Sequence, residues 1–531
     1  MNEKDYTHRG WLALVALIIL LLGVSFIPPQ SIGGISFRRA NILSDLISFA
    51  DKIEVEKESP LFDEAEYRVD MEAVAEQIEA DTLPPVVETR FAWDLSSRTE
   101  PADSIAQNRI MPDTTRLLST LIDIEDFDST GNGRLKAFYH KLAKHTAPVR
   151  IAVLGDSFIE GDILTADLRE KLQSAYDGGG VGFVPVSSPL TGFRRTVKTQ
   201  AKGWTAYNIM QRKAAPQHLR DNFYISGWVC QPTVDASTRW ECTDAREHLE
   251  SVQVARVFFV SPNNSRVEVV VNDSQRREFA IEGDASVRQI VVSADSIHSL
   301  TFKVRSGVDG FIGYGALFED RCGVVVDNYS VRSNNGQAMF WTNPSINAQI
   351  NAALEYDLVI LQYGLNIMQA GVRNYSKYAD QVDKMIAYTR QCFPTAAILV
   401  LGVSDRAVKT EEGFVSMDAI PSMLSSQRRA AETAGVAFWS TYEAMVAQGG
   451  MLQFVANGWA GKDFTHINYA GGRRVAYSLF DAINHGVTEA VKTEHRHSRT
   501  HEFENILDTL QRAEMDELFL PVVVRQPTLN P

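Results

Sequence analysis

A chain of 531 residues is too long for one compact core, so the sequence predicts two or more domains. Hydrophobic residues make up 45% and charged residues 22%, proportions that are typical of a globular protein. The formal net charge of −14 argues against a partner with a phosphate backbone, so no nucleic acid is expected. Basic pairs such as Arg194-Arg195 and Arg473-Arg474 are isolated and are typical of ordinary surface charge.

Near the N-terminus, residues 11–27 form an unbroken apolar run, WLALVALIILLLGVSFI, which ends at Pro28-Pro29. The run is short for a spanning helix and long for a signal-peptide core, and no clear cleavage site of small residues follows it. The sequence therefore favours an uncleaved transmembrane anchor over a signal peptide. Residues 1–10 are then a cytoplasmic tail, and the rest of this single-pass protein lies in the periplasm or at the cell exterior.

Residues 28–114 are acidic, with scattered prolines and little periodicity, which is typical of an extracytoplasmic spacer. Next comes Asp126–Gly133, which looks superficially like a calcium loop. Ala137 stands where such a loop needs its last glutamate, so a calcium site is rejected. No metal-ligand cluster is visible along the chain, and neither a metal nor a cofactor is expected.

The apolar run Val149–Leu154 predicts a buried strand, and Gly155-Asp156-Ser157 follows it directly. A helical pattern then covers Leu164–Leu172. A serine at a strand-to-helix turn can expose its hydroxyl and leave its backbone N–H free. Ser157 is therefore a candidate nucleophile.

Between residues 206 and 320 helical patterns are nearly absent, and short β-rich runs alternate with turn residues. These runs cover residues 254–260, 266–271, 288–292 and 300–304. Regularly spaced short strands of this kind favour a β-sandwich, inserted here into an α/β domain.

The inserted domain is a candidate carbohydrate-binding module. Trp228, Trp240 and Tyr224 are candidates for stacking on sugar rings, and a buried core position is the alternative for each. Cys230 and Cys242 are either bridged in an oxidising compartment or small buried hydrophobic residues, and both interpretations stay open.

After the insertion, buried strands at 357–362 and 396–402 alternate with helices at 375–391 and 423–435. This alternation predicts an α/β fold with a parallel, doubly wound sheet. Its first part covers residues 115–205 and its second part residues 321–490. Residues 491–531 are a polar C-terminal tail without a predicted function.

Candidate functional residues lie directly after the predicted buried strands. Ligands of doubly wound sheets bind at the carboxyl ends of strands, and Ser157, Gly364 and Asn366 lie just past such ends. In the segment Asp463-Phe464-Thr465-His466, a histidine and the aspartate three residues before it supply a base and its orienting carboxylate. Together with Ser157 they make the set of groups that acyl transfer needs.

Gly155-Asp156-Ser157, Gly364-Leu365-Asn366 and Asp463–His466 stand in the order of the conserved blocks of the SGNH (GDSL-type) hydrolase superfamily, which this sequence resembles. The stretch Gly155–Pro185 is most similar to the peptidoglycan O-acetylesterase branch, whose members carry a β-sandwich between the first and second blocks. The resemblance covers roughly Leu135–Ala482 and implies a flavodoxin-like sheet.

The resemblance implies a role for each of these residues. Ser157 would be the nucleophile, His466 the general base and then acid, and Asp463 the group that orients the imidazole. The oxyanion hole would be formed by the Ser157 N–H, the side chain of Asn366 and a backbone N–H of the second block.

The second block, Asp327–Gly336, departs from the family pattern, because the position of its glycine falls on Ser333. A serine still supplies a backbone N–H, although it adopts a positive φ less easily than glycine does. Gly336 is the alternative donor.

The resemblance implies a serine esterase that removes O-acetyl or other small acyl groups from an envelope polysaccharide such as peptidoglycan, through an acyl-enzyme on Ser157. One alternative is an O-acetyltransferase acting on an envelope glycan with the same residues. A second is a non-catalytic glycan-binding or assembly protein. The expected partners are an acetylated polysaccharide and, through residues 11–27, the membrane.

Overall fold

The computed structural model describes residues 30–32, 35–37, 90–97, 121–130, 133–189, 193–411 and 413–518, with side chains only between residues 91 and 493. The chain divides into two compact units, Met1–Arg68 and Val69–Pro531. In the first unit, β1 (Gln30–Ile32) and β2 (Ile35–Phe37) form an antiparallel pair. Among the described residues no helix is long and apolar enough to span a membrane, and the predicted anchor at 11–27 lies outside them.

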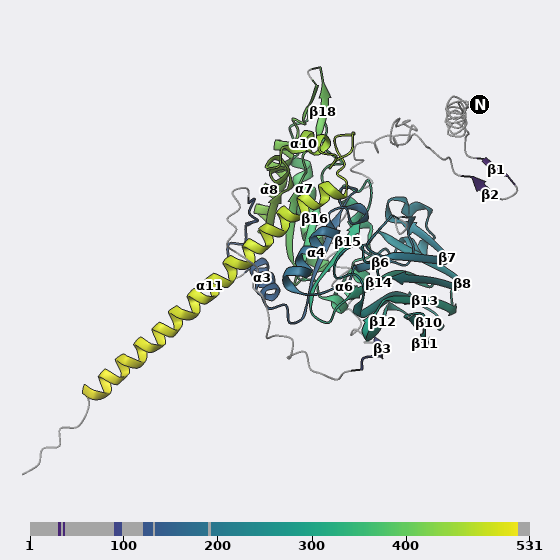
Figure 1. The fold of residues 1–531 in the computed structure, drawn as a ribbon, viewed down its shortest axis with the longest axis horizontal. Coiled ribbons are helices and arrows are strands. Elements are labelled where there is room, and N and C mark those ends of the chain that lie inside the picture. The colour runs from purple at the N-terminus through teal and green to yellow at the C-terminus, as the bar shows by residue number, and fades with distance from the viewer. Residues whose placement is uncertain are drawn as a thin grey trace, which may run out of the picture. The chain divides into compact units, whose positions relative to one another are not determined.

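A six-stranded sheet forms the centre of the α/β part of the second unit (Figure 1). Across this sheet the order is β15 (Gly323–Ser330), β5 (Pro148–Gly155), β16 (Leu358–Gln362), β17 (Ala397–Gly402), β20 (Ala437–Ser440) and β4 (Glu125–Asp126). The first five strands are parallel, and β4 is antiparallel to β20. Renumbered along the chain, the parallel strands have the flavodoxin-like order 2-1-3-4-5. The predicted doubly wound sheet is therefore present.

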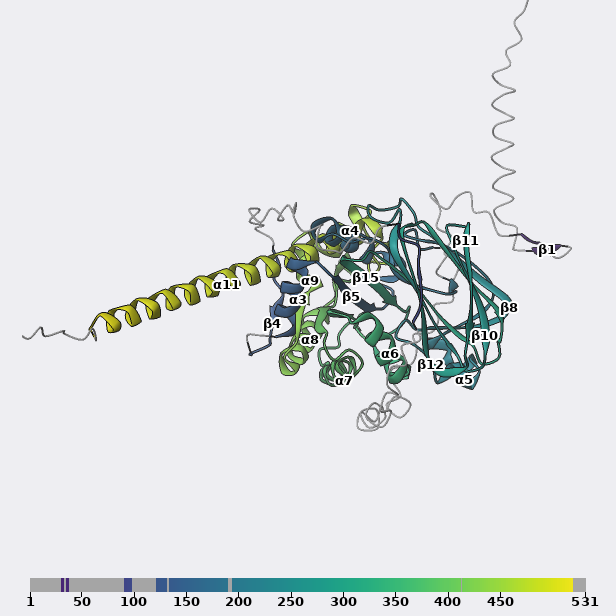
Figure 2. The same ribbon diagram turned by 90° about the horizontal axis from the view of Figure 1, so that it is seen from below.

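Helices cover both faces of this sheet, as Figure 2 shows. In one group, α3 (Arg134–Lys144), α4 (Thr165–Tyr176) and α9 (Thr441–Val446) each pack against α11 (Tyr469–Leu518). In the other group, α6 (Pro344–Leu354) and α8 (Ile420–Ala434) both pack against α7 (Ser376–Cys392). The three helices predicted at 164–172, 375–391 and 423–435 correspond to α4, α7 and α8. The segment predicted as a polar tail continues α11 as far as Leu518.

A second, ten-stranded sheet is formed by β3 and the strands that lie between β5 and β15 in the chain. Its members are β3 (Arg90–Asp94), β6 (Gly182–Pro185), β7 (Lys198–Asn208), β8 (Trp228–Glu241), β9 (Val252–Ser261), β10 (Ser265–Val271), β11 (Gln275–Ile281), β12 (Asp284–Ile297), β13 (Ser299–Ser306) and β14 (Ile312–Glu319). All its pairs are antiparallel except β3 with β12. The strands are joined in one hydrogen-bonded sheet, and its division into the two sheets of a sandwich stays a prediction.

The ten-stranded sheet encloses an apolar core of its own, in which the rings of Phe259 and Phe311 stack at 5.2 Å. Trp240 and Tyr224 are fully buried, so these two candidates for sugar stacking were wrong. Trp240 belongs to the apolar core of the ten-stranded sheet, whereas Tyr224 packs against Phe183 and Tyr329 in the core of the α/β part. Trp228 is 7% exposed and lines a small pocket that also contacts Ser330.

Cys230 and Cys242 both carry free thiols in the structure, so the interpretation as a disulfide is not supported. Their sulfur atoms donate to the carbonyl oxygens of Ser187 and Ile297, at 3.3 and 3.5 Å. Burial raises the pKa of each thiol to about 12. Both side chains therefore behave as small, unreactive hydrophobic residues.

A buried chain of hydroxyl groups connects the ten-stranded sheet region to the second block of the α/β sheet. The hydroxyl of Tyr224 lies 3.0 Å from that of Tyr329, which lies 2.6 Å from that of Tyr356. The chain ends on Asp327, which accepts from Tyr356 at 2.6 Å. Burial raises the pKa of Asp327 to about 6, against the hydrogen bonds that favour its ionised form.

An ion-pair network joins the same two sheets. Glu319, at the end of β14, is fully buried between Arg150 of β5 and Arg256 of β9. The distances from its carboxylate to the two guanidinium groups are 2.7 and 2.6 Å. Because removal of one partner would leave a buried charge uncompensated, this network favours one fixed arrangement of the two sheets.

Candidate active site

The turn that follows β5 carries the candidate nucleophile, Ser157. The strand is buried and ends at Gly155, and the N–H of Phe158 donates to Asp156 Oδ1 at 2.9 Å, which fixes the turn around Ser157. Ser157 Oγ lies 3.2 Å from His466 Nε2. The strand order reverses between β5 and β16, which is where doubly wound sheets bind their ligands.

The loop between α10 (Gly450–Ala456) and α11 carries the other two candidate residues. His466 Nδ1 lies 2.6 Å from Asp463 Oδ2, and the N–H of His466 donates to Asp463 Oδ1 at 3.1 Å. A bridge between Ala460 and Ile467 closes this loop. The structure thus brings Ser157, His466 and Asp463 into one hydrogen-bonded chain.

The carboxyl group of Asp463 is ionised at neutral pH. Partial burial acts to raise its pKa, but hydrogen bonds from the side chain and backbone of His466 and from the backbone of Thr465 outweigh burial and lower the pKa to about 2. The side chains of His466 and Asp463 are 48% and 51% exposed, so water has direct access to them.

Asn366 lies just past β16, where its amide nitrogen contacts both of the other motif loops. Its Nδ2 donates to Asp156 Oδ2 and to the backbone oxygen of Asn334, each at 3.1 Å. An amide nitrogen has two protons, so both are already bonded. For Asn366 to donate to an oxyanion, one of these bonds must be exchanged.

Asp156 and Asn334 were missed by the sequence reasoning as parts of the site. Asp156 is fully buried, and burial raises its pKa to about 7, although hydrogen bonds such as that from Phe158 favour the ionised form. Asn334 Oδ1 accepts from the N–H groups of Gly336 and Ala338 at 2.9 and 3.3 Å. The only sequence signal for Asp156 was its place beside Ser157.

Ser333 adopts a left-handed backbone conformation with φ 62°, which is the conformation that a glycine would adopt without strain. Within the described part of the chain, the N–H groups of Ser157 and Ser333 have no hydrogen-bond acceptor. The N–H of Gly336 is bonded to Asn334 Oδ1. Of the two donors considered from the sequence, Ser333 is therefore the one with an available N–H.

An ion pair that the sequence did not indicate connects the second block to the turn after the nucleophile. Arg332 Nε donates to Glu160 Oε2 at 2.9 Å, and the Glu160 side chain is only 6% exposed. Glu160 begins the 3-10 turn Glu160–Asp162, so the pair holds the residue before Ser333 against the nucleophile loop.

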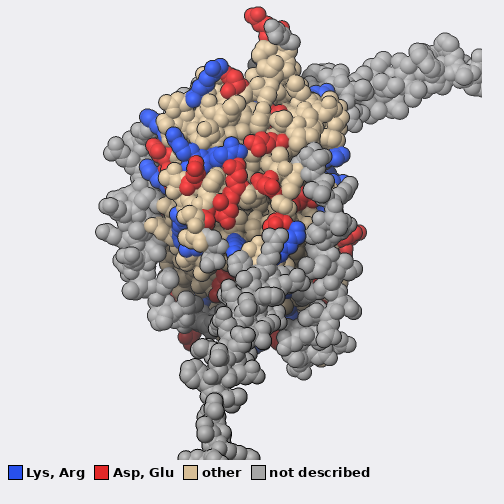
Figure 3. Space-filling view, turned by 90° about the vertical axis from the view of Figure 1, so that its left-hand side faces the viewer, with Lys and Arg blue, Asp and Glu red and all other residues tan. Residues whose placement is uncertain are grey.

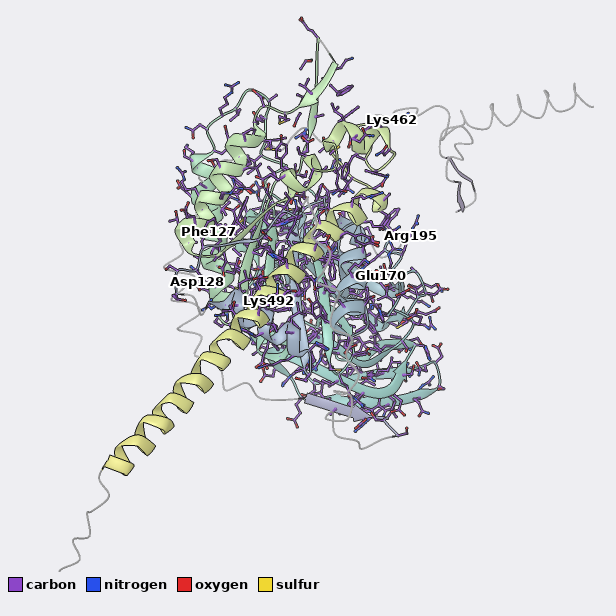
Figure 4. The ribbon with its side chains drawn as sticks, turned by 60° about the vertical axis from the view of Figure 1, so that its left-hand side comes forward. Phe127, Asp128, Glu170, Arg195, Lys462 and Lys492 are labelled. Carbon is purple, nitrogen blue, oxygen red and sulfur yellow. The ribbon has the colours of Figure 1, made fainter. Side chains whose placement is uncertain are left out.

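Basic side chains lie near the start of α11. Arg195 lies 5.3 Å from the ring of Tyr469, whose hydroxyl donates to Gly161 at 2.8 Å. Arg195 and Lys462 are labelled in Figure 4 near the start of α11. On the face shown in Figure 3, acidic and basic side chains are interspersed. Within the described residues no group of three His, Cys, Asp or Glu side chains is placed to hold a metal ion.

No protein-family model and no curated protein matches the chain. Among solved structures, a peptidoglycan O-acetylesterase is similar with a TM-score of 0.56 and 20% identity, over 69% of this chain and 99% of that chain. The chain has the fold of the SGNH hydrolases. In this SGNH fold, the motif residues Ser157, Ser333 and Asn366 follow β5, β15 and β16, and His466 precedes α11.

The search of solved structures also found two family two carbohydrate esterases. One, from Cellvibrio japonicus, is 8% identical with a TM-score of 0.24, over 55% of this chain and 98% of that chain. The other, from Clostridium thermocellum, was solved with cellohexaose and is 12% identical with a TM-score of 0.22, over 50% of this chain and 95% of that chain.

Proposed function

We propose that the protein is a serine esterase that removes O-acetyl or other small acyl groups from an envelope polysaccharide such as peptidoglycan. The observation that carries this proposal is the hydrogen-bonded chain from Ser157 through His466 to Asp463. A nucleophile, a base and an ionised carboxylate in this order are what acyl transfer requires. The likeness to a peptidoglycan O-acetylesterase supports the choice of an acetylated glycan as substrate.

In the proposed reaction, Ser157 Oγ attacks the acyl carbonyl carbon while His466 Nε2 takes its proton. The tetrahedral intermediate collapses, His466 returns the proton to the departing sugar oxygen, and the acyl group stays on Ser157. Water activated by His466 then releases the acid. Asp463 stays ionised and stabilises the imidazolium that forms in both steps.

The negative oxygen of each intermediate needs hydrogen-bond donors that are already in place. We assign the N–H groups of Ser157 and Ser333 to this role, because neither is bonded among the described residues. The amide of Asn366 is the third donor, and it must exchange its bond to the Asn334 oxygen for one to the oxyanion.

Exposure of the site favours hydrolysis over transfer of the acyl group to a second sugar. A transferase must keep water away from its acyl-enzyme. Here His466 is 48% exposed, so water reaches the group that would activate it. The complete chain of Ser157, His466 and Asp463 also argues against a purely glycan-binding protein.

The proposal includes the location of the enzyme in the cell. The apolar run at residues 11–27 supports an anchor that holds the enzyme at the outer face of the cell membrane, near the wall. A protease-protection experiment on intact spheroplasts tests this part separately. Cleavage of the catalytic region by added protease is expected, and protection of that region would contradict it.

One assay tests the activity and its main alternative. The full chain is incubated with 4-nitrophenyl acetate, with and without a sugar acceptor, and Ser157→Ala serves as the control. Release of acetate that does not depend on the acceptor supports the esterase. A product that forms only with the acceptor would indicate a transferase, and the absence of any Ser157-dependent turnover would contradict both.

A further inference from the structure

A two-stranded hairpin projects next to the proposed catalytic loop, at the top of Figure 1. It consists of β18 (Ala407–Thr410) and β19 (Gly413–Ser416), and Thr410 Oγ donates to the Gly413 oxygen at 2.8 Å across its turn. In Figure 3 the projecting segment at the top is mostly uncharged below an acidic tip. Nothing in the proposed reaction requires such a projection.

The hairpin begins directly on two loops of the site. The N–H of Ala407 donates to the backbone oxygen of Phe464 at 3.0 Å, and Phe464 lies between Asp463 and His466. Arg406, just before the hairpin, donates to the backbone oxygen of Leu365 at 3.5 Å. The base of the hairpin thus contacts the loop of His466 and the loop of Asn366.

Phe414 of the hairpin and Phe464 of the catalytic loop form a stacked pair, called here the aromatic pair. Their ring centroids are 3.8 Å apart and the planes differ by 12°. Phe464 has φ 55°, a backbone conformation that is rare for a bulky side chain and that persists where the surroundings impose it. Phe414 is 39% exposed, so one side of its ring rests on Phe464 and the rest is open to solvent.

The strand register determines which residues accompany the aromatic pair. Phe414 is opposite Lys409 and Val415 is opposite Val408, and opposite residues of paired strands share a face. Lys409 therefore emerges on the same face as Phe414, whereas Val415 lies on the other face. A ring with an adjacent ammonium group offers an apolar surface and hydrogen-bond donors together. A pyranose ring presents the matching surface, with C–H groups on its face and hydroxyl groups at its edge.

We propose that the aromatic pair is a sugar-binding subsite, in which a pyranose ring of the glycan stacks on the exposed side of Phe414. This inference rests on the proposed function, because the pair is continuous with the loop of His466. Trp240 and Tyr224, which the sequence offered as candidates for sugar stacking, are buried and cannot serve this role. A stable protein interface needs about 1,200–2,000 Å² of buried surface, far more than one ring on a narrow hairpin provides.

A binding measurement tests the subsite without turnover. The full chain carrying Ser157→Ala is titrated calorimetrically with peptidoglycan fragments, chitohexaose and xylohexaose. We compare affinities for the sugar that the Ser157→Ala protein binds. Adding Phe414→Ala is expected to weaken the affinity for this sugar by ~10-fold, whereas adding Phe414→Trp is expected to retain the affinity. Val415→Ala is the matched control, because Val415 is 41% exposed on the same strand but on the opposite face. Equal affinities of the Phe414→Ala and Val415→Ala proteins, or no binding of any probe by the parent, would overturn the proposal.

A kinetic comparison separates sugar binding from positioning of His466. In the Phe414→Ala enzyme, kcat/KM for O-acetylated peptidoglycan is expected to fall ~10-fold relative to kcat/KM for 4-nitrophenyl acetate. An equal fall for both substrates would show that the ring only positions the catalytic loop, and a change of oligomeric state would show that it contacts a second copy. Either result overturns the subsite. If the wild type hydrolyses neither substrate, the proposed function fails, and the titration still decides on the subsite.

Discussion

The side-chain amide of Asn366 donates to the carboxylate of Asp156 at 3.1 Å, and this bond joins the loop after β16 to the loop that carries Ser157. The same nitrogen donates to Asn334 in the loop after β15. Three segments that are separated by up to 210 residues therefore meet at one amide group. Its removal is expected to affect the position of each loop and not only one donor of the oxyanion hole.

Asn366→Ala is expected to lower kcat for small esters by about a hundred- to a thousandfold, as the loss of one oxyanion donor does. It also leaves the Asn334 oxygen and the buried Asp156 carboxylate without this partner, which costs about 1–3 kcal/mol of unfolding free energy. Steady-state kinetics and thermal unfolding check the two parts. A lower Tm with an unchanged kcat would mean that Asn366 has only a structural role.

Ser333→Gly is expected to leave activity equal or raise it, and to raise Tm. The left-handed φ of 62° costs a side chain about 1 kcal/mol, which glycine avoids, while its N–H can stay in place. Part of this gain is offset because glycine makes the unfolded chain more flexible. A clear fall in kcat would show that the serine side chain itself takes part.

Gly336→Ala provides the contrasting variant for the same loop. Gly336 has φ 98°, and a β-carbon there would collide with the sulfur of Met385. We therefore expect a lower Tm for this variant, whereas Ser333→Gly raises it.

The titration of Asp156 predicts a pH-dependent stability. Burial raises its pKa in the folded protein to about 7, whereas the unfolded value is about 4. The protonated carboxyl group of Asp156 therefore contributes fully to the free energy of unfolding below about pH 4. This contribution is lost as the pH rises toward 7. The Asp156→Asn protein lacks this ionisable group. The Tm of the variant minus the Tm of the wild type should therefore be larger near pH 8 than near pH 5. A difference in Tm that is the same at both pH values would contradict this pKa.

The buried hydroxyl chain predicts energetic coupling between the ten-stranded sheet region and the second block. The hydroxyl oxygens of Tyr224 and Tyr329 lie 3.0 Å apart, within hydrogen-bonding distance. A double-mutant cycle of Tyr224→Phe and Tyr329→Phe, measured by denaturant unfolding, should give an interaction energy of about 0.5–3 kcal/mol. Additive effects would mean that the two parts are not coupled through this bond.

The hydrophobic pattern predicted the α/β part well, because buried parallel strands such as Leu358–Gln362 and Ala397–Gly402 are continuous apolar runs. The order of the motifs then placed Ser157, Asn366 and His466 at one edge of the sheet. The strand Arg90–Asp94 was assigned to a spacer, because its partner β12 lies almost two hundred residues away and leaves no local signal.

The details of the site were less predictable. The contacts of Asn366 with Asp156 and Asn334 depend on how three loops meet in space, which no local pattern encodes. The conformation of Ser333 was anticipated only through the glycine of the family pattern. Trp240 is buried in the core of the ten-stranded sheet and Tyr224 in the core of the α/β part, and both positions depend on long-range packing that a single sequence does not reveal.

The central claim is that Ser157 carries the acyl group during turnover. Mass spectrometry of the full chain, quenched during reaction with 4-nitrophenyl acetate, tests this claim most directly. We predict a Ser157-containing peptide that is heavier by one acetyl group, and the loss of this adduct together with ester turnover in Ser157→Ala. Turnover without an adduct on Ser157, or activity of Ser157→Ala within about tenfold of the wild type, would contradict the account.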